Sequence, residues 1–310
     1  MILVAGGTGR LGRLVVELLR QRELDVRVLT RNVESAAPLR TLGVEVVHGD
    51  IRRADDVVAA VDGVDTVLSA VHGFAGPGRV SPVSVDRNGN RTLVEAAEHV
   101  GASVVMMSVV GAEPDSPLEL FRMKAAAERH LRTASSSWTL VRSAAFAELW
   151  IDLLEQTAAR GGRPLVFGRG RQPIEFVSVR DVAQAVGIAL LDKSLRGRAI
   201  EIAGPDRWTF TRLAEAVQDS AGRPGPPRHV PPAMLRMMAS LAAGVRPQLA
   251  RQARAALVMD RAPLPTADGA FRLEHPEVPS TSITDVLAAG AGTAAGSAPG
   301  SRRPAARRHP

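Results

Sequence analysis

The chain of 310 residues contains no cysteine and no tyrosine. The lack of cysteine excludes disulfides, thiolate catalysis and cysteine-based metal sites, and we expect no metal. The lack of tyrosine removes a phenol that could donate a proton in catalysis. No apolar run is long enough to span a membrane, and Met1 leads directly into an apolar segment without a basic leader. We therefore expect a cytoplasmic protein with no membrane partner.

Concentrated positive charge is also missing from the body of the chain, although the formal net charge is +7. Part of that charge belongs to the last residues, where Arg302, Arg303, Arg307 and Arg308 follow a single acid, Asp285. No basic stripe is interleaved with aromatic residues, which make up only 3% of the chain. Nucleic acid is therefore not an expected partner. The apolar fraction of 45% is enough for a substantial core.

What the chain has instead is a glycine-rich turn directly after an apolar strand. Residues 2–5 form a short apolar run, the spacing Gly6-x-x-Gly9-x-x-Gly12 follows, and apolar residues then recur at helical intervals. Glycines allow a tight turn that brings the backbone close to a ligand, and the helix N-terminus favours an anion such as a pyrophosphate. The alternative is a tight turn without ligand. The predicted dinucleotide-binding residues are Gly6, Gly7, Thr8, Gly9, Arg10, Leu11 and Gly12.

The end of the second predicted strand, residues 25–31, bears on which dinucleotide is bound. An acid there would bond the ribose 2′-hydroxyl of NAD, whereas an arginine would pair with the 2′-phosphate of NADP. The chain has Arg31 at this point and no acid before Glu34, and Arg10 could reach the same phosphate. The pattern favours NADP(H) over NAD(H). Alternatively, Arg31 only marks a solvated strand end.

Strands and helices alternate further along the chain, which predicts an α/β protein with a Rossmann-type, doubly wound parallel sheet and a small C-terminal substrate-binding region. The fourth strand, residues 64–71, should end at the crevice where ligands bind. We therefore expect Ser69, Ala70 and Val71 to pass beneath the cofactor. His72 follows in a glycine-rich loop and is a candidate acid/base group beside the substrate, although a loop histidine can equally be solvated.

Several motifs resemble the atypical, extended-type branch of the short-chain dehydrogenase/reductases, and within it the NmrA-like NAD(P)-binding proteins. They are the glycine spacing, a K-x-x-x-E helix from Lys124, and a T-x-x-R-x-x-x-F turn ending at Phe146. The resemblance covers about Met1–Gly222. It implies that Asp50 and Ile51 lie along the adenine, with Asp50 accepting from the exocyclic amine. Alternatively, Asp50 caps the helix expected at residues 54–61.

The resemblance also implies catalytic roles for Ser108 and Lys124. Classical members of the superfamily use a Ser, a Tyr and a Lys, the Tyr standing four residues before the Lys. Here that position is Leu120, so the standard mechanism is excluded. Lys124 is then expected to bind the cofactor or to donate a proton itself; the alternative is a solvated helix residue. For Ser108, the alternative is a strand-end hydroxyl bonded to backbone.

The chain is expected to divide into a dinucleotide-binding domain at 1–145, a substrate region at 146–287 that interleaves with late Rossmann elements at 173–204, and a disordered tail at 288–310. Phe146 and Trp150 are predicted to line an apolar substrate pocket, unless they belong to a core. The sequence favours an NADP(H)-dependent oxidoreductase acting on a small carbonyl- or quinone-like substrate. A non-catalytic NADP(H) sensor and a non-redox epimerase or dehydratase are the alternatives. Substrate identity, hydride direction and oligomeric state stay open, a homodimer being one option.

Overall fold

The computed structural model describes residues 1–295 and is built on one parallel sheet. Its seven strands run in the order β10-β6-β5-β4-β1-β2-β3, and every neighbouring pair is parallel. The order reverses between β1 and β4, so the carboxyl ends of these two strands flank a crevice. The strands are β1 (Ile2–Ala5), β2 (Val26–Thr30), β3 (Glu45–His48), β4 (Thr66–Ser69), β5 (Ser103–Val109), β6 (Trp138–Ser143) and β10 (Arg198–Ile202).

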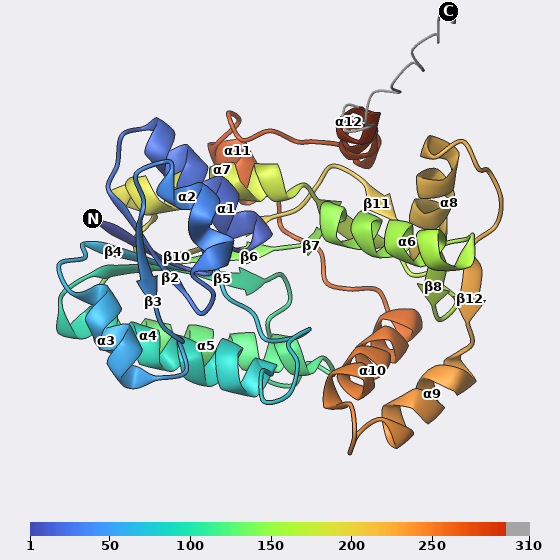
Figure 1. Ribbon diagram of the computed structural model, residues 1–310, viewed down its shortest axis with the longest axis horizontal. Coiled ribbons are helices and arrows are strands. Elements are labelled where there is room, and N and C mark those ends of the chain that lie inside the picture. The colour runs from blue at the N-terminus through green and yellow to red at the C-terminus, as the bar shows by residue number, and fades with distance from the viewer. Residues whose placement is uncertain (296–310) are drawn as a thin grey trace, which may run out of the picture.

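Helices cover both faces of this sheet (Figure 1). One face carries α1 (Arg10–Gln21), α2 (Ala37–Arg40) and α7 (Val179–Leu191), and the other carries α3 (Ala54–Val61), α4 (Asn90–His99) and α5 (Glu119–Ala134). Each side has its own apolar core, because the strands are buried on both faces. Short 3-10 turns, η1 (Glu34–Ala36) and η3 (Lys193–Leu195), complete this part. The predicted doubly wound α/β fold is confirmed.

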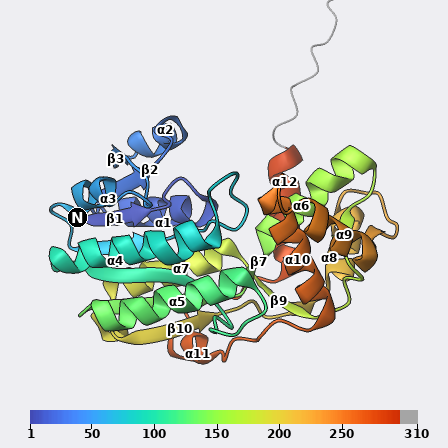
Figure 2. The same ribbon diagram turned by 90° about the horizontal axis from the view of Figure 1, so that it is seen from below.

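The second part of the molecule lies beyond the carboxyl ends of the strands (Figure 2). Its small sheets join β7 (Ala145–Phe146), β9 (Ile174–Val177) and β11 (Arg207–Trp208), and β8 (Leu165–Phe167) with β12 (Arg228–Val230). A separate core includes Phe176, Trp208 and Leu213. The helices are α6 (Ala147–Gly161), α8 (Phe210–Ser220), α9 (Pro232–Leu241), α10 (Pro247–Arg261) and α12 (Ile283–Ala295).

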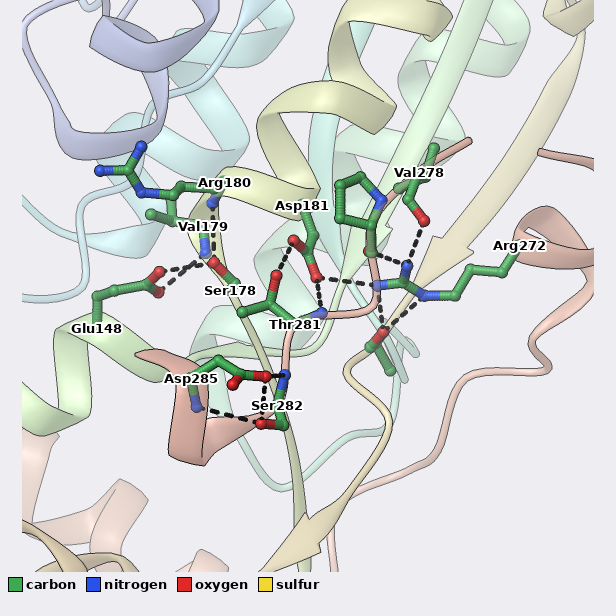
Figure 3. A network of polar contacts seen from close by, with 12 residues as sticks. Glu148, Ser178, Val179, Arg180, Asp181, Arg272, Val278, Thr281, Ser282 and Asp285 are labelled. Carbon is green, nitrogen blue, oxygen red and sulfur yellow. Dashed lines mark hydrogen bonds and ion pairs between the residues drawn. The ribbon is translucent and has the colours of Figure 1, made fainter. Parts of the chain in front are cut away.

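A polar network ties the C-terminal segment to α7, as Figure 3 shows. The Asp181 carboxylate accepts from the backbone N–H and the hydroxyl of Thr281 at 2.8 and 2.7 Å. Arg272, in α11 (Ala270–Glu274), lies 3.3 Å from the same carboxylate and donates to the Ala203 carbonyl at 2.9 Å. Ser178 caps α7 by accepting from the Arg180 N–H. The segment after residue 270 is thereby fastened to the sheet.

An eight-residue π-helix, η2 (Pro82–Gly89), precedes α4; Ser81 caps it and α4 continues it. One expectation differs from the structure in detail. Helix α12 extends to Ala295, across the first residues of the expected tail at 288–310; residues 296–310 lie outside the described part. Over residues 1–295, no helix combines the length and apolarity needed to cross a bilayer.

Candidate functional site

The glycine turn between β1 and α1 has no room for side chains at its contact points. A Cβ at Gly6, whose φ is +91°, would lie 2.6 Å from the Ala70 carbonyl oxygen, and a Cβ at Gly12 would lie 2.2 Å from the Gly6 oxygen. Gly9 precedes α1, and no side chain of residues 1–295 caps that N-terminus. The free N–H groups and the helix dipole therefore face outward at the crevice. This arrangement fits a dinucleotide diphosphate and brings the predicted Gly6–Gly12 residues beside Ala70 and Val71.

The predicted adenosine end lies beyond β2 and β3. Arg52 donates from Nε and Nη2 to the Asp50 carboxylate at 3.0 and 2.5 Å, and these bonds hold the pKa of Asp50 below its ordinary value. Asp50 does not cap α3, whose first residue follows Arg53. Arg31 is exposed and forms no ion pair with any described residue. Ile51 is buried, and a Cβ at Gly89 would lie 3.0 Å from its Cγ2.

Lys124 and Asp86 form the buried centre of the site. Lys124 is 4% exposed, and its Nζ lies 3.0 Å from Oδ1 of Asp86, which is 0% exposed. Nζ also donates to the carbonyls of Val71 at 3.1 Å and Met107 at 2.9 Å. The two carbonyls accept hydrogen bonds from the ammonium, and the Asp86 carboxylate pairs with its charge. The reading of Lys124 as a solvated helix residue is therefore wrong.

The same pair holds the backbone on both sides of His72. Lys124 bonds the Val71 carbonyl, and the Asp86 Oδ2 accepts from the Gly73 N–H at 2.8 Å. His72 is an exposed residue. Partial desolvation lowers the pKa of His72 and nearby Lys124 adds to the lowering, while Asp86 opposes it. Hydrogen bonds to Val71 and Gly73 therefore fix the backbone on both sides of His72, at the carboxyl end of β4.

Ser108 lies near the end of β5, next to Met107. Its side chain is 3% exposed, and among the described residues its hydroxyl has no hydrogen-bond partner. The alternative role for Ser108, a hydroxyl bonded to backbone, is therefore wrong. A buried polar group without a partner is costly, which leaves this hydroxyl available to a ligand. Ser69, at the end of β4, differs because it is buried against the Asn90 side-chain oxygen.

The K-x-x-x-E and T-x-x-R-x-x-x-F motifs are joined in the structure by an ion pair between Glu128 and Arg142. Arg142, on β6, donates from Nε and Nη2 to the Glu128 carboxylate of α5 at 3.0 and 2.6 Å, and also approaches Glu201 at 3.3 Å. The Glu128 bonds raise the pKa of Arg142. This two-point contact fixes α5 against the sheet and so fixes Lys124.

The predicted substrate residues begin the second part of the molecule. Phe146 ends β7 and immediately precedes α6, and it packs partly against the Rossmann core. Trp150 packs on Phe210, with ring centroids 4.6 Å apart, and belongs to the edge of the smaller core. Asp152, two residues further along α6, forms an ion pair with Arg10 of the glycine turn. The first turns of α6 therefore face the candidate cofactor site.

Several residues that shape this site are not among those predicted from the sequence. Asp86 and Asn90 lie four positions apart and are both 0% exposed, and Asn90 donates to the Asp86 carbonyl at 2.8 Å. Their spacing inside an otherwise amphipathic helix was the available signal. Arg251 of α10 was not foreseeable, because 177 positions separate it from Phe74, whose carbonyl it bonds. Within residues 1–295, no group of three or more His, Asp or Glu side chains is placed to hold a metal.

Arg251 connects the second part of the molecule to the loop that follows His72. It is 9% exposed, and it donates to the carbonyls of Phe74 at 3.0 Å and of Gly76 and Val80 at 3.3 Å. Three carbonyls on one guanidinium restrain the whole loop. Arg251 of α10 therefore holds the glycine-rich loop after His72 in place.

Comparisons with known proteins agree with this geometry. A family model described as NAD(P)H-binding matches residues 6–193. The NAD(P)H azoreductase of Xenophilus azovorans is 30% identical over 226 residues, which cover 72% of this chain and 75% of that protein. Quinone oxidoreductase 2 of Escherichia coli is 24% identical over 225 residues, which cover 72% of this chain and 75% of that protein.

Solved structures show the same fold at lower identity. The NADPH-dependent quinone oxidoreductase QOR2 of Escherichia coli, complexed with NADPH, has a TM-score of 0.74 at 21% identity and covers 93% of this chain and 99% of its own. The triphenylmethane reductase of Citrobacter sp., complexed with NADP(H), has a TM-score of 0.74 at 19% identity with the same coverage.

Proposed function

The chain belongs to the NAD(P)H-binding family whose model spans residues 6–193, and from that premise we propose that it is an NADPH-dependent reductase of a small, apolar acceptor of the quinone type. Bound NADPH supplies the hydride. The glycine turn and the open N-terminus of α1 hold the diphosphate, and the exposed Arg31 after β2 pairs with the 2′-phosphate. Arg52 compensates the charge of Asp50, so that carboxylate does not repel the phosphate.

The observation that carries the choice of acceptor is Leu120, which stands one helical turn before Lys124 in a chain without tyrosine. Hydride addition to a simple ketone leaves a strongly basic alkoxide, which needs a positioned acid. Addition to a quinone leaves an anion delocalised over an aromatic ring, which is far less basic. A site without a phenol is therefore suited to the second class of acceptor.

The remaining groups suit this chemistry. The buried hydroxyl of Ser108, which has no partner among the described residues, would donate a hydrogen bond to the developing oxyanion. His72 would supply the proton from its place on the rigid backbone between the bonds to Lys124 and Asp86. Lys124 acts here as a positioning residue, since its buried ammonium is held by two backbone carbonyls and by the Asp86 carboxylate. Phe146 and Trp150 would contribute the apolar wall.

The names of two relatives support this choice of substrate class: one is an NAD(P)H azoreductase, and the other is a quinone oxidoreductase. Quinones and azo compounds are flat, conjugated hydride acceptors whose reduced forms spread the added charge. The property that the two substrate classes share is their ability to delocalise the negative charge that hydride transfer adds.

The test is NADPH consumption by purified protein with a para-quinone, an azo dye and an unconjugated ketone. We expect turnover of the quinone, with at least about a hundredfold lower kcat/KM for the ketone, the scale of one missing general acid. Ser108→Ala should lower kcat for the quinone by at least about tenfold. Ser103→Ala, on the same strand but at its other end, is the control and should not. NADPH binding without turnover of any acceptor would instead support a sensor, and a product of unchanged redox state would support an epimerase.

A further inference from the structure

Helix α9 is apolar on two faces, and the described residues of the chain cover only one of them. Leu235 and Ala239 are buried against α10 and the β8–β12 sheet. Met234, Met237 and Leu241 form a second stripe at helical spacing and are all exposed, Leu241 at 74%. Val245 continues this stripe into the turn before α10 and is 84% exposed. A surface helix normally has one apolar face, which packs on the core. We therefore expect the second, exposed stripe to contact a partner.

The charge around this stripe has one sign. The sequence from Ser220 to Met259 contains no Asp or Glu, but it contains six arginines: Arg223, Arg228, Arg236, Arg246, Arg251 and Arg254. Arg251 is buried and is used on the loop after His72. Arg236, Arg246 and Arg254 are exposed on the same two helices as the apolar stripe. The surface therefore combines protruding apolar side chains with uncompensated positive charge.

We infer that this tip, defined as Met234, Met237, Leu241 and Val245 with Arg236 and Arg246, docks on the surface of an anionic lipid bilayer. The turn between α9 and α10 lies at the lower edge of the molecule in Figure 1, where a flat surface can reach it. The apolar side chains would enter the headgroup region, and the arginines would meet the lipid phosphates. The contact is peripheral, so it needs no spanning helix.

Other occupants fit the surface less well. In a two-fold dimer built on this patch, the arginines of one copy would face those of the other, and no acid between Ser220 and Met259 would balance them. A peptide helix needs a long groove. The depression here, lined by Met237, Leu241, Val245 and Leu249 among others, measures only about 270 Å³. Leu241 and Val245 are 74% and 84% exposed, so their side chains are accessible for insertion into a bilayer.

The experiment is cosedimentation of the full chain with vesicles of phosphatidylcholine alone or mixed with phosphatidylglycerol, without NADPH or acceptor. We expect binding only to the mixed vesicles, weakening with added salt. Leu241→Ser/Val245→Ser should weaken it at least about tenfold. Arg236→Gln/Arg246→Gln should weaken it about fivefold per charge. Leu273→Ser, which changes a residue 86% exposed in α11, should have no effect.

Several results would overturn the inference. Equal binding to both kinds of vesicle would remove the role of charge, and no binding to either would remove the bilayer as partner. Unchanged binding by the tip variants would assign the binding to other residues, such as the arginines of residues 302–308, which every variant retains. A dimer that the Leu241→Ser/Val245→Ser variant dissociates would make a second copy the occupant. Because no turnover is measured, these outcomes are independent of the proposed reduction.

Discussion

Lys124 and Asp86 meet in a buried ion pair, Nζ to Oδ1 3.0 Å, and each also bonds the backbone of a residue beside His72. The pair joins α5 to the η2 helix and to the end of β4. In a site without tyrosine the lysine has no phenol whose pKa it could lower. Its ammonium instead donates to two backbone carbonyls and pairs with the Asp86 carboxylate. The role of Lys124 in the K-x-x-x-E motif is therefore to hold the loop between β4 and η2.

Removing one partner of this pair should be costly, because the other stays buried with its charge. Lys124→Met should reduce the free energy of unfolding by about 3–5 kcal/mol, as measured by urea denaturation. The double variant Lys124→Met/Asp86→Asn should recover part of that loss, since no unpaired carboxylate remains. Lys193→Met, which changes the exposed lysine of η3, should stay within about 0.5 kcal/mol of the parent. Strictly additive losses in the double variant would contradict the pair.

The pH dependence of turnover should report His72. Desolvation holds its pKa below the ordinary value of about 6.5, and only the imidazolium can donate the proton. The rate of quinone reduction should therefore fall as pH rises, with a midpoint below about 6.5. His72→Asn should remove this limb, and His99→Asn, which changes an exposed residue of α4, should keep it. A limb that survives His72→Asn would assign the proton to another donor.

The lowered pKa of His72 should also make the stability of the fold depend on pH. Between the folded pKa of His72 and about 6.5, the unfolded chain binds more protons than the folded one. The free energy of unfolding should therefore rise with pH between these two pKa values. The stabilisation is fully present above about 6.5 and is lost as pH falls through the pKa that His72 has in the folded state. Denaturation midpoints of the parent and of His72→Asn across this window test the sign. A parent that becomes less stable, relative to the variant, as pH rises would contradict it.

The sequence predicted the parts of the fold that depend on local patterns. The doubly wound parallel sheet with its helices and the family resemblance were confirmed, because buried parallel strands and amphipathic helices leave periodic signals. Helix boundaries were less exact, since α12 runs to Ala295 inside the expected tail. Long-range polar contacts leave no such signal. Asp86 with Lys124, Glu128 with Arg142 and Arg251 with the loop at 74–80 depend on tertiary packing. The assigned roles of Ser108, Arg31, Phe146 and Trp150 stay predictions.

The glycine turn offers a matched pair of substitutions. Gly12→Ala would put a methyl group 2.2 Å from the Gly6 oxygen and 2.8 Å from the Gly7 Cα. The helix must then shift, which should cost about 1–3 kcal/mol of stability and weaken NADPH binding. A Cβ at Gly187, in α7, meets nothing within 4 Å. Gly187→Ala should therefore raise stability by about 0.5–1 kcal/mol and leave binding unchanged. Calorimetric titration and thermal unfolding measure both, and equal effects would contradict the close approach.

The cofactor preference should depend on Arg31. Its guanidinium is exposed at the end of β2, near enough to Asp50 to lower that residue's pKa. Arg31→Ala should weaken NADPH binding about tenfold, the scale of one charge-assisted hydrogen bond, and leave NADH binding unchanged. Arg40→Ala, which changes another exposed arginine in α2, is the control. Equal losses for both cofactors would mean that Arg31 contacts a part that they share.

Arg251 should keep the loop at residues 74–80, which follows His72, in its observed conformation. Arg251→Gln removes a guanidinium that bonds three carbonyls of residues 74–80. We expect a stability loss of about 2–3 kcal/mol, faster amide hydrogen exchange over residues 73–80, and a raised KM for the acceptor. Arg254→Gln, one turn further along α10, removes a single bond to the Ala239 carbonyl and should do none of these. If exchange over the loop were equal in both variants, the loop would owe its order to Asp86 and the π-helix alone, and α10 would have no part in shaping the site.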